Sequence, residues 1–216
     1  MTWPVLVINL ERSTERWTHM QNAFSGETLA RIVGVDGSQW QDASRSRPRM
    51  SVAGATSLVS QGVLCEGEEN TVLKPGEIGC ALGHRAAWEW IVANDPEYAI
   101  VLEDDIQVGG GYVDSLQNSI ELQGGMPDGA DVLFLSQDDG FGRPNLNSGL
   151  LDRKEGPNYG YLISPAAAQA AIDSQFPMFL NCAEQWKQNI SMHIVGTSII
   201  RMDEIGLQTC MDYLGE

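Results

Sequence analysis

Residues 97–106 read EYAIVLEDDI, in which a short apolar run leads directly into three consecutive carboxylates. The run at residues 99–102 is typical of a strand that is covered on both faces of a sheet. Neighbouring carboxylates repel one another, by about 4 kcal/mol for two charges ~4 Å apart in a partly screened site. The fold must therefore offset the repulsion between Glu103, Asp104 and Asp105.

Short apolar runs alternate with helical patterns along the chain, which favours an α/β fold with a largely parallel central sheet flanked by helices. Besides residues 99–102, we expect strands at residues 5–8, 29–37, 130–136 and 158–164. We expect helices after residues 13–14, from 75 to about 93, and from 165 onwards. Serine or proline, both common at helix starts, stands at each of these beginnings.

The length and composition suit one domain, because 216 residues with 43% hydrophobic content can bury a sizeable core. We expect a single domain over residues 1–216, with an irregular insertion or lid at about residues 38–75. Ser, Arg, Gly and Gln dominate that stretch, and no hydrophobic period is sustained in it. A connection of this length is usually functional or mobile.

The charge balance limits the partners of the protein. With 13 Lys+Arg against 29 Asp+Glu the net charge is -16, so the electrostatic field repels phosphate backbones and nucleic acid is not an expected partner. An anionic substrate would need a bound cation or a local basic cluster. The four cysteines are far apart and form no CxxC pair, which is typical of free thiols in a reducing compartment.

The N-terminal stretch has no basic start or cleavage site, and its apolar run is too short for a signal peptide or a membrane span. We expect no transmembrane segment and a cytoplasmic location. The chain shows no basic or amphipathic tail for membrane docking, so peripheral attachment at the inner face of a membrane would need a partner.

The carboxylates follow a predicted central strand, and ligands of α/β sheets bind beyond the carboxyl ends of such strands. Alternation along an extended chain predicts that Glu103 and Asp105 point to the same side. Two carboxylates on one side form half of a site for Mn²⁺ or Mg²⁺, which waters and substrate phosphates would complete. The alternative is an acidic turn that meets only solvent or Ca²⁺.

Three motifs in order give the chain a resemblance to a known family: VINLERSTER at residues 7–16, GEIGCALGH at 76–84 and VLEDD at 101–105. Together they resemble glycosyltransferase family 25, which includes bacterial lipopolysaccharide and lipooligosaccharide galactosyltransferases and collagen galactosyltransferases. The resemblance covers residue 5 to about 108, and more weakly the segment YGYLISPAAAQAAI.

The resemblance implies a GT-A-like nucleotide-diphospho-sugar transferase fold and a metal-dependent, inverting transfer of a hexose, galactose, from a UDP-sugar to a glycan or lipid-linked glycan. Glu103 and Asp105 would hold the metal that bridges the diphosphate. The implied nucleotide-sugar site contains Asn9, Leu10, Arg12, Arg16, Asp36, His84 and Asp104. A domain of this family that binds nucleotide sugar or glycan without turnover is the alternative.

Several of these residues have ordinary structural alternatives. Arg12 and Arg16 could lie on a helix surface and pair with nearby glutamates. His84 shares a predicted helix face with apolar side chains, where a histidine is often a hydrogen-bonded core residue. Gly83 stands where the family usually has serine, so a role for that hydroxyl is in doubt.

Inversion at a sugar carbon requires a base that takes the proton of the acceptor hydroxyl. The candidates are Asp138 and Asp139, which follow a predicted strand, and Glu184, which stands near the position of an aspartate in the family. Glutamate for aspartate lengthens the side chain and weakens that match.

Overall fold

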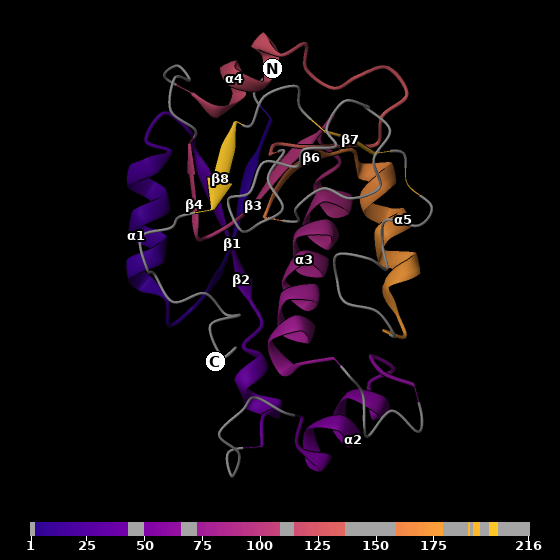
Figure 1. Cartoon of the computed structure of the whole chain (residues 1–216). Helices are drawn as coiled ribbons and strands as arrows, with labels where there is room; N and C mark the ends of the chain where they lie inside the picture. Colours follow the sequence, from indigo (N-terminus) through magenta and orange to yellow (C-terminus); the bar gives the residue numbers. More distant parts are fainter. Residues whose placement is uncertain are drawn as a thin grey trace, which may run out of the picture.

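The computed structural model describes residues 3–42, 50–65, 73–108, 115–136, 159–178, 190, 192–194 and 199–202. Its elements, shown in Figure 1, are β1 (Val5–Leu10), α1 (Thr14–Ala23), β2 (Leu29–Gly34), the 3-10 helix η1 (Gly37–Trp40), α2 (Val52–Ser60), α3 (Pro75–Asn94), β3 (Ala99–Glu103), β4 (Ile106–Val108), α4 (Leu116–Leu122), β5 (Val132–Phe134), β6 (Gly160–Ile163), α5 (Pro165–Gln175), β7 (Met192–Ile194) and β8 (Ile200–Met202).

Within the described residues, six strands form one sheet in the order β2-β1-β3-β6-β5-β7. β1 is parallel to both β2 and β3, and β5 is parallel to β7, whereas β6 is antiparallel to both of its neighbours. β4 and β8 form a separate antiparallel pair. The prediction of a mixed, mostly parallel sheet flanked by helices is confirmed.

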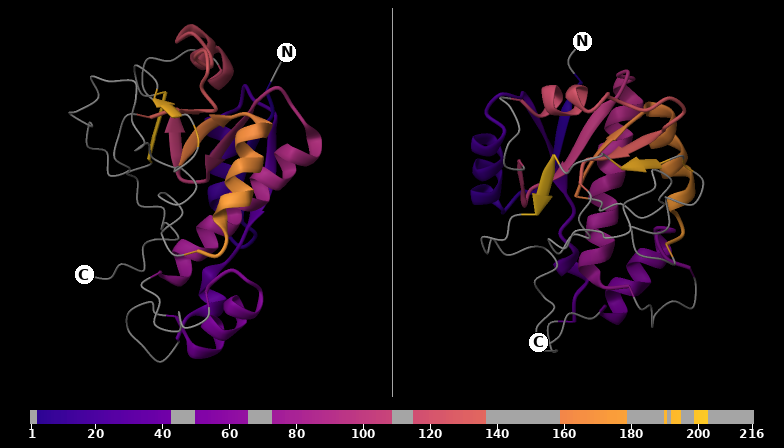
Figure 2. Two further views of the ribbon diagram at one scale, coloured as in Figure 1. Left: turned by 90° about the vertical axis from the view of Figure 1, so that its right-hand side faces the viewer. Right: turned by 45° about the horizontal axis from the view of Figure 1, so that its top comes forward.

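Two apolar clusters cover the two faces of the sheet, and alternation along the strands divides their side chains. Leu6 belongs to the cluster that contains Trp88 of α3 and Ala168 of α5. Val5 and Val7 belong to the other cluster, which contains side chains of α1 and α4. Figure 2 shows α3 and α5 side by side on one face, with β4 and β8 on the opposite side. The central strands are therefore apolar on both faces, as their sequences indicate.

Two glycines let α3 approach the sheet closely. A Cβ atom at Gly83 would lie 2.9 Å from Cγ2 of Ile8, and one at Gly79 would lie 2.5 Å from the carbonyl oxygen of Val35. Real Cβ atoms do not make contacts this short, so position 79, which faces a backbone oxygen, needs glycine with the backbone as it stands. At Gly83 the neighbour is a side-chain methyl, so a serine there would require the Ile8 side chain to shift.

The stretch at 38–75, expected to be irregular, contains regular structure in its described part. η1, which begins at Gly37, extends into it, and α2 runs from Val52 to Ser60 with the Ser51 hydroxyl accepting a hydrogen bond from the Gly54 amide. The helix α2 is hard to predict from the sequence, because glycine and β-branched residues have low helix propensity. Gly54 is needed because a Cβ there would lie 2.7 Å from the carbonyl oxygen of Trp40.

Other predicted elements are found with bounds that differ by a few residues: β1, β3 and α3 are slightly longer than expected, and β2, β5 and β6 are shorter. The elements α4, β4, β7 and β8 were not predicted. The strands expected at 130–136 and 158–164 are β5 and β6. Within the part of the chain that the structure describes, none of the helices has the length and apolar character to span a bilayer.

Candidate functional site

A pocket lies between the ends of β1 and β3, the turn after β2 and the first turns of α3. Seven residues singled out from the sequence line it: Leu10, Arg12, Arg16, Asp36, His84, Glu103 and Asp104. Its enclosed volume is about 80 Å³. This volume is smaller than the roughly 300–1,000 Å³ that is typical of small-molecule sites.

At one wall of the pocket, Asn9, Arg16, Asp104 and Asp105 form a buried group that we call the arginine cluster. Of these four, Arg16 and Asp104 line the pocket. Nη2 of Arg16 lies 2.6 Å from Oδ1 of Asp104 and 2.6 Å from Oδ2 of Asp105. Asn9, at the end of β1, donates from its side-chain amide to Asp104 and to the carbonyl oxygen of Ser13. A guanidinium from α1 therefore offsets the repulsion within the acidic triplet.

Burial dominates the titration of these two aspartates. It raises the pKa of Asp105 to about 7, with a further increase from the charges of Glu103 and Asp104, against the opposing effect of Arg16. Burial likewise raises the pKa of Asp104 above its usual range, opposed by Arg16 and by the hydrogen bond from Asn9. The proton affinity of the triplet is thus high on the side of the arginine cluster.

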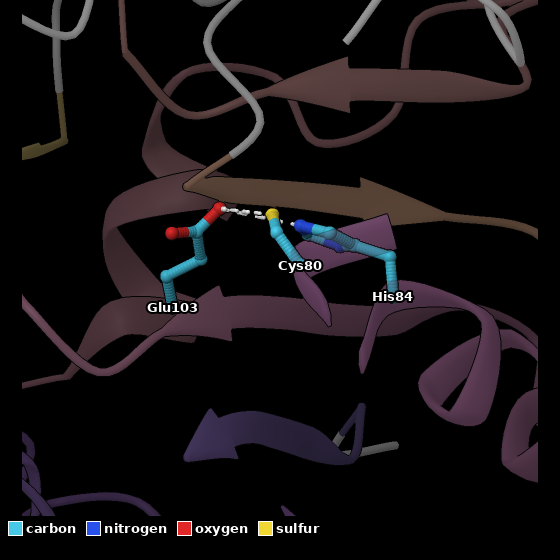
Figure 3. A group of neighbouring side chains, drawn as sticks. All are labelled: Cys80, His84 and Glu103. Carbon is cyan, nitrogen blue, oxygen red and sulfur yellow. Dashed lines mark hydrogen bonds and ion pairs between the residues drawn. The ribbon is translucent and has the colours of Figure 1, made fainter. Parts of the chain in front are cut away.

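On the other side of the strand end, Cys80, His84, Glu103 and Tyr161 form a second group that we call the histidine cluster. Nε2 of His84 and Sγ of Cys80 lie 3.2 and 3.8 Å from the same oxygen, Oε1 of Glu103. Nδ1 of His84 lies 2.8 Å from the hydroxyl of Tyr161 in β6. Figure 3 shows Cys80 and His84 on α3 pointing toward Glu103 at the end of β3.

The histidine cluster stabilises a charged imidazole. Burial alone would lower the pKa of His84, but the hydrogen bonds and charges of Cys80 and Glu103 outweigh it and raise the pKa to about 9. Burial would raise the pKa of Glu103, yet the hydrogen bond and charge of His84 lower it below its usual range. Without other ligands, a carboxylate and an imidazolium therefore face one another beside the thiol.

The position of His84 is compatible with both interpretations made from the sequence, and its role in a site stays a prediction. His84 is buried and hydrogen-bonded, as a core histidine is, and its side chain also lines the pocket. Cys80 and Tyr161 are the residues that sequence reasoning missed. The spacing of four between Cys80 and His84 in GEIGCALGH could have identified the first, because it places both on one helix face.

The two arginines of the first motif have aspartate partners from other segments. Nε and Nη2 of Arg12 donate to the carboxylate of Asp36 at 3.0 and 3.3 Å, and both side chains are exposed. Asp36 also accepts from the amide of Ser38 and so starts η1. Arg16 is buried, which corrects the alternative of a helix-surface position for that residue.

The expectation that Glu103 and Asp105 share one side of an extended strand is wrong. β3 ends at Glu103, and the chain turns at Asp104 and Asp105 before β4 begins, so the alternation of a strand stops there. Glu103 contacts residues of α3, whereas Asp105 is paired with Arg16 of α1. The three candidates for the catalytic base, Asp138, Asp139 and Glu184, lie outside the described residues.

Comparison with known proteins identifies relatives of this chain. The sequence profile of glycosyltransferase family 25, described as LPS biosynthesis protein, matches residues 2–128. Two curated proteins named glycosyltransferase 25 family member, from Aedes aegypti and Anopheles gambiae, are each 34% identical over 105 residues. That stretch is 48% of this chain and only 16% of either relative.

Among solved structures, the apo crystal structure of mouse xyloside xylosyltransferase 1 is similar with a TM-score of 0.40 and 10% sequence identity. The superposition covers 95% of this chain and 86% of that one.

Proposed function

Because the chain belongs to glycosyltransferase family 25, we propose that it is a metal-dependent, inverting glycosyltransferase that moves galactose from UDP-galactose to a hydroxyl of a glycan. The proposed acceptor is either a soluble or a lipid-linked glycan. The proposed location is the cytoplasm or the inner face of a membrane. The choices of metal, inversion, donor and sugar come from the resemblance of its motifs to those of the family.

One observation carries the proposal: every residue that lines the pocket lies within the segment that the family profile matches. The lining runs from Ile8 to Asp104, and the match covers residues 2–128. The pocket also lies at the carboxyl ends of β1 and β3, where α/β proteins bind their ligands. The part of the chain that defines the family is thus the part that builds this pocket.

The cationic side chains at the pocket support binding of an anionic donor. Arg12 and Lys74 line it, and Arg12 has a half-exposed guanidinium. In a protein of net charge -16, these residues supply the local positive charge that donor phosphates need. Arg12 can offer two parallel N–H donors to phosphate oxygens, and Asp36 beside it offers acceptors to sugar hydroxyls.

Two carboxylates of the acidic triplet, those of Glu103 and Asp105, offer the oxygen ligands that Mn²⁺ or Mg²⁺ requires. Glu103 lines the pocket with its side chain 22% exposed. Oδ1 of Asp105 is buried and has no hydrogen-bond partner among the described residues. One or two carboxylates suffice for these ions when waters and phosphate oxygens complete the shell, so we propose Glu103 and Asp105 as the ligands. The ion would neutralise charge on the departing diphosphate.

The proton of the acceptor hydroxyl needs a separate base, and Asp138, Asp139 and Glu184 remain the proposed candidates. Replacement of the true base by its amide, as in Glu184→Gln, should leave donor binding unchanged and lower transfer by roughly 100-fold or more. Measurement of both quantities for the three variants identifies the base.

The decisive experiment is calorimetric titration of UDP into the protein with Mn²⁺ and with EDTA. We expect binding that requires Mn²⁺ and that is weakened at least about 10-fold by Glu103→Gln or Asp105→Ala. Glu89→Gln is the matched control, because Glu89 is an exposed carboxylate of α3 that pairs with Arg85 away from the pocket.

Donor hydrolysis then separates a transferase from a domain that only binds nucleotide sugar. UDP-galactose that binds but is neither hydrolysed nor transferred supports the second. If UDP, GDP and CMP all fail to bind under every condition, the pocket is not a nucleotide site and the proposal is refuted.

A further inference from the structure

We propose that Cys80, His84 and Glu103 form a binding site for a thiophilic divalent cation, Zn²⁺ above all, with three protein ligands and a fourth position open to the pocket. All three side chains line the pocket. This ligand set differs from the pair Glu103 and Asp105, and the inference does not depend on glycosyl transfer. It concerns the metal that these side chains select.

The spacing of the three donor atoms matches a tetrahedral zinc site. The sulfur, nitrogen and oxygen atoms all lie within 4.8 Å of one another. With usual Zn–S, Zn–N and Zn–O bond lengths, tetrahedral angles place such ligand atoms about 3.3–3.6 Å apart. The distances from Oε1 of Glu103 are 3.2 Å to Nε2 of His84 and 3.8 Å to Sγ of Cys80. Small adjustments of rotamers would therefore suffice.

The sequence brings these ligands together through two rigid elements. Cys80 and His84 are one helical turn apart on α3 and so project from the same face. Glu103 is the last residue of β3, a central strand of the main sheet. Figure 3 shows the three side chains converging from these two elements. Ligands held by a helix and a central strand are preorganised before any metal arrives.

The surroundings of His84 are those of a metal-binding histidine. Such a residue usually donates its other ring N–H to a fixed acceptor, which orients the ring. Nδ1 of His84 lies 2.8 Å from the Tyr161 hydroxyl, which also accepts a hydrogen bond from the indole of Trp88 at 2.9 Å. The rings of His84 and Tyr161 are stacked with centroids 5.7 Å apart. Nε2 is therefore the nitrogen directed at Glu103 and Cys80.

The donor set selects the type of metal. A thiolate with an imidazole and a carboxylate favours Zn²⁺ or Co²⁺, whereas Mg²⁺ and Mn²⁺ prefer oxygen atoms alone. Binding would release the thiol proton and any proton on Nε2 of His84 to solvent. The two positive charges of the ion would then balance the thiolate and the carboxylate, in place of the imidazolium that faces Glu103 without the metal.

Spectroscopy with Co²⁺ tests the proposal directly. The protein is prepared with Cys65, Cys182 and Cys210 replaced by serine, so that Cys80 is its single thiol. After removal of metals by EDTA and desalting, Co²⁺ alone is added and the near-ultraviolet absorption is recorded. We expect a thiolate-to-cobalt charge-transfer band that saturates at one equivalent and that Zn²⁺ displaces but Mg²⁺ does not.

Three variants of the single-cysteine protein identify the ligands, with circular dichroism as the check on folding. Cys80→Ser should abolish the band. His84→Gln should weaken Zn²⁺ binding by at least about 100-fold, because loss of a direct ligand should cost at least as much as the largest losses seen when a residue that only orients a ligand is removed. Glu89→Gln, which changes an exposed carboxylate of the same helix that pairs with Arg85, should retain the band and the affinity. No band in the folded single-cysteine protein would refute the proposal, and so would Zn²⁺ affinity that is equal in the folded His84→Gln variant.

Discussion

The arginine cluster and the histidine cluster hold neighbouring carboxylates of one acidic triplet in opposite ways. Asp104 and Asp105 face a guanidinium, which carries a permanent charge and fixed geometry. Glu103 faces an imidazole and a thiol, which exchange protons and bind metals. Half of the first cluster, Arg16 and Asp104, lines the pocket, whereas three of the four residues of the second cluster do. Adjacency in sequence therefore does not mean equivalence in role.

The difference indicates which carboxylates are structural. An ion pair with both partners buried is costly to break, because removal of one partner leaves the other charge uncompensated in the protein interior. Groups that exchange protons and ligands suit a site that meets substrates. We interpret the pairs of Arg16 with Asp104 and Asp105 as the support of the turn after β3. The histidine cluster and the unpartnered Oδ1 of Asp105 are the groups that are left to bind ligands.

The largest expected effect comes from Arg16→Met, which leaves two buried carboxylates unpaired. We expect a loss of about 3–5 kcal/mol in the free energy of unfolding, measured by urea denaturation. The matched control is Arg12→Met, because the Arg12 and Asp36 side chains are 51% and 38% exposed and their pair should contribute at most about 1 kcal/mol. Equal losses in the two variants would show that the arginine cluster has no special structural role.

The next effect separates the clusters by pH. The pKa of Asp105 rises from 3.8 to about 7 on folding and that of His84 from 6.5 to about 9. A pKa raised in the folded state gives stability that is complete below the unfolded value and is lost as pH rises through the folded value. The unfolding free energy should thus fall from pH 5 to 7 through Asp105 and from pH 7 to 9 through His84.

Urea denaturation across this range in EDTA tests the assignment. Asp105→Asn should flatten the lower window and His84→Gln the upper one, each by an amount on the order of 2 kcal/mol. The lowered pKa of Glu103 acts in the opposite direction, but only below its ordinary value of 4.5, outside the range measured. If both variants flatten the same window, the two clusters titrate as one unit.

The smallest expected effect on stability comes from a change in the histidine cluster, at Tyr161. Tyr161→Phe removes the hydroxyl that His84 and Trp88 contact, which should cost about 1–2 kcal/mol of stability in thermal or urea unfolding. It should also weaken Zn²⁺ binding by about 10–100-fold, because the ring loses its outer partner.

Tyr159→Phe serves as the control for that change. The hydroxyl of Tyr159 donates to Ser136, on the side of the other apolar cluster. Its loss should reduce stability without a change in Zn²⁺ affinity. A Tyr161→Phe variant with unchanged Zn²⁺ affinity would show that Tyr161 serves packing alone.

The sequence predicted the parts of the fold that depend on local pattern. The apolar runs of β1 and β3, the start of α3 at Pro75 and its end near Asp95 follow from hydrophobicity, proline and helix capping. The resemblance implied nine nucleotide-sugar and metal residues, and seven of the nine line the pocket, all except Asn9 and Asp105.

The contacts that decide the roles of these residues could not be predicted from local pattern. Because the chain turns at Asp104 and Asp105, the side chain of Asp105 does not lie on the same side as that of Glu103. The alternation of side chains along a strand cannot predict such a turn between two strands. Arg16 is buried because α1 packs beside β4, which is a tertiary contact. Tyr161 reaches His84 only because β6 lies antiparallel beside β3, a neighbour that no periodicity specifies.

The position of β6 has a consequence for the order in which a ribosome delivers the site. Every residue that lines the pocket has been synthesised once Asp104 is added, and Tyr161 follows 57 residues later (161 minus 104). At translation rates of about 5–20 residues per second, that gap lasts roughly 3–11 s. During this interval the nascent chain already carries both walls of its pocket while Nδ1 of His84 lacks the hydroxyl that will later orient it. The histidine cluster is therefore completed late in synthesis, after the arginine cluster has all of its members.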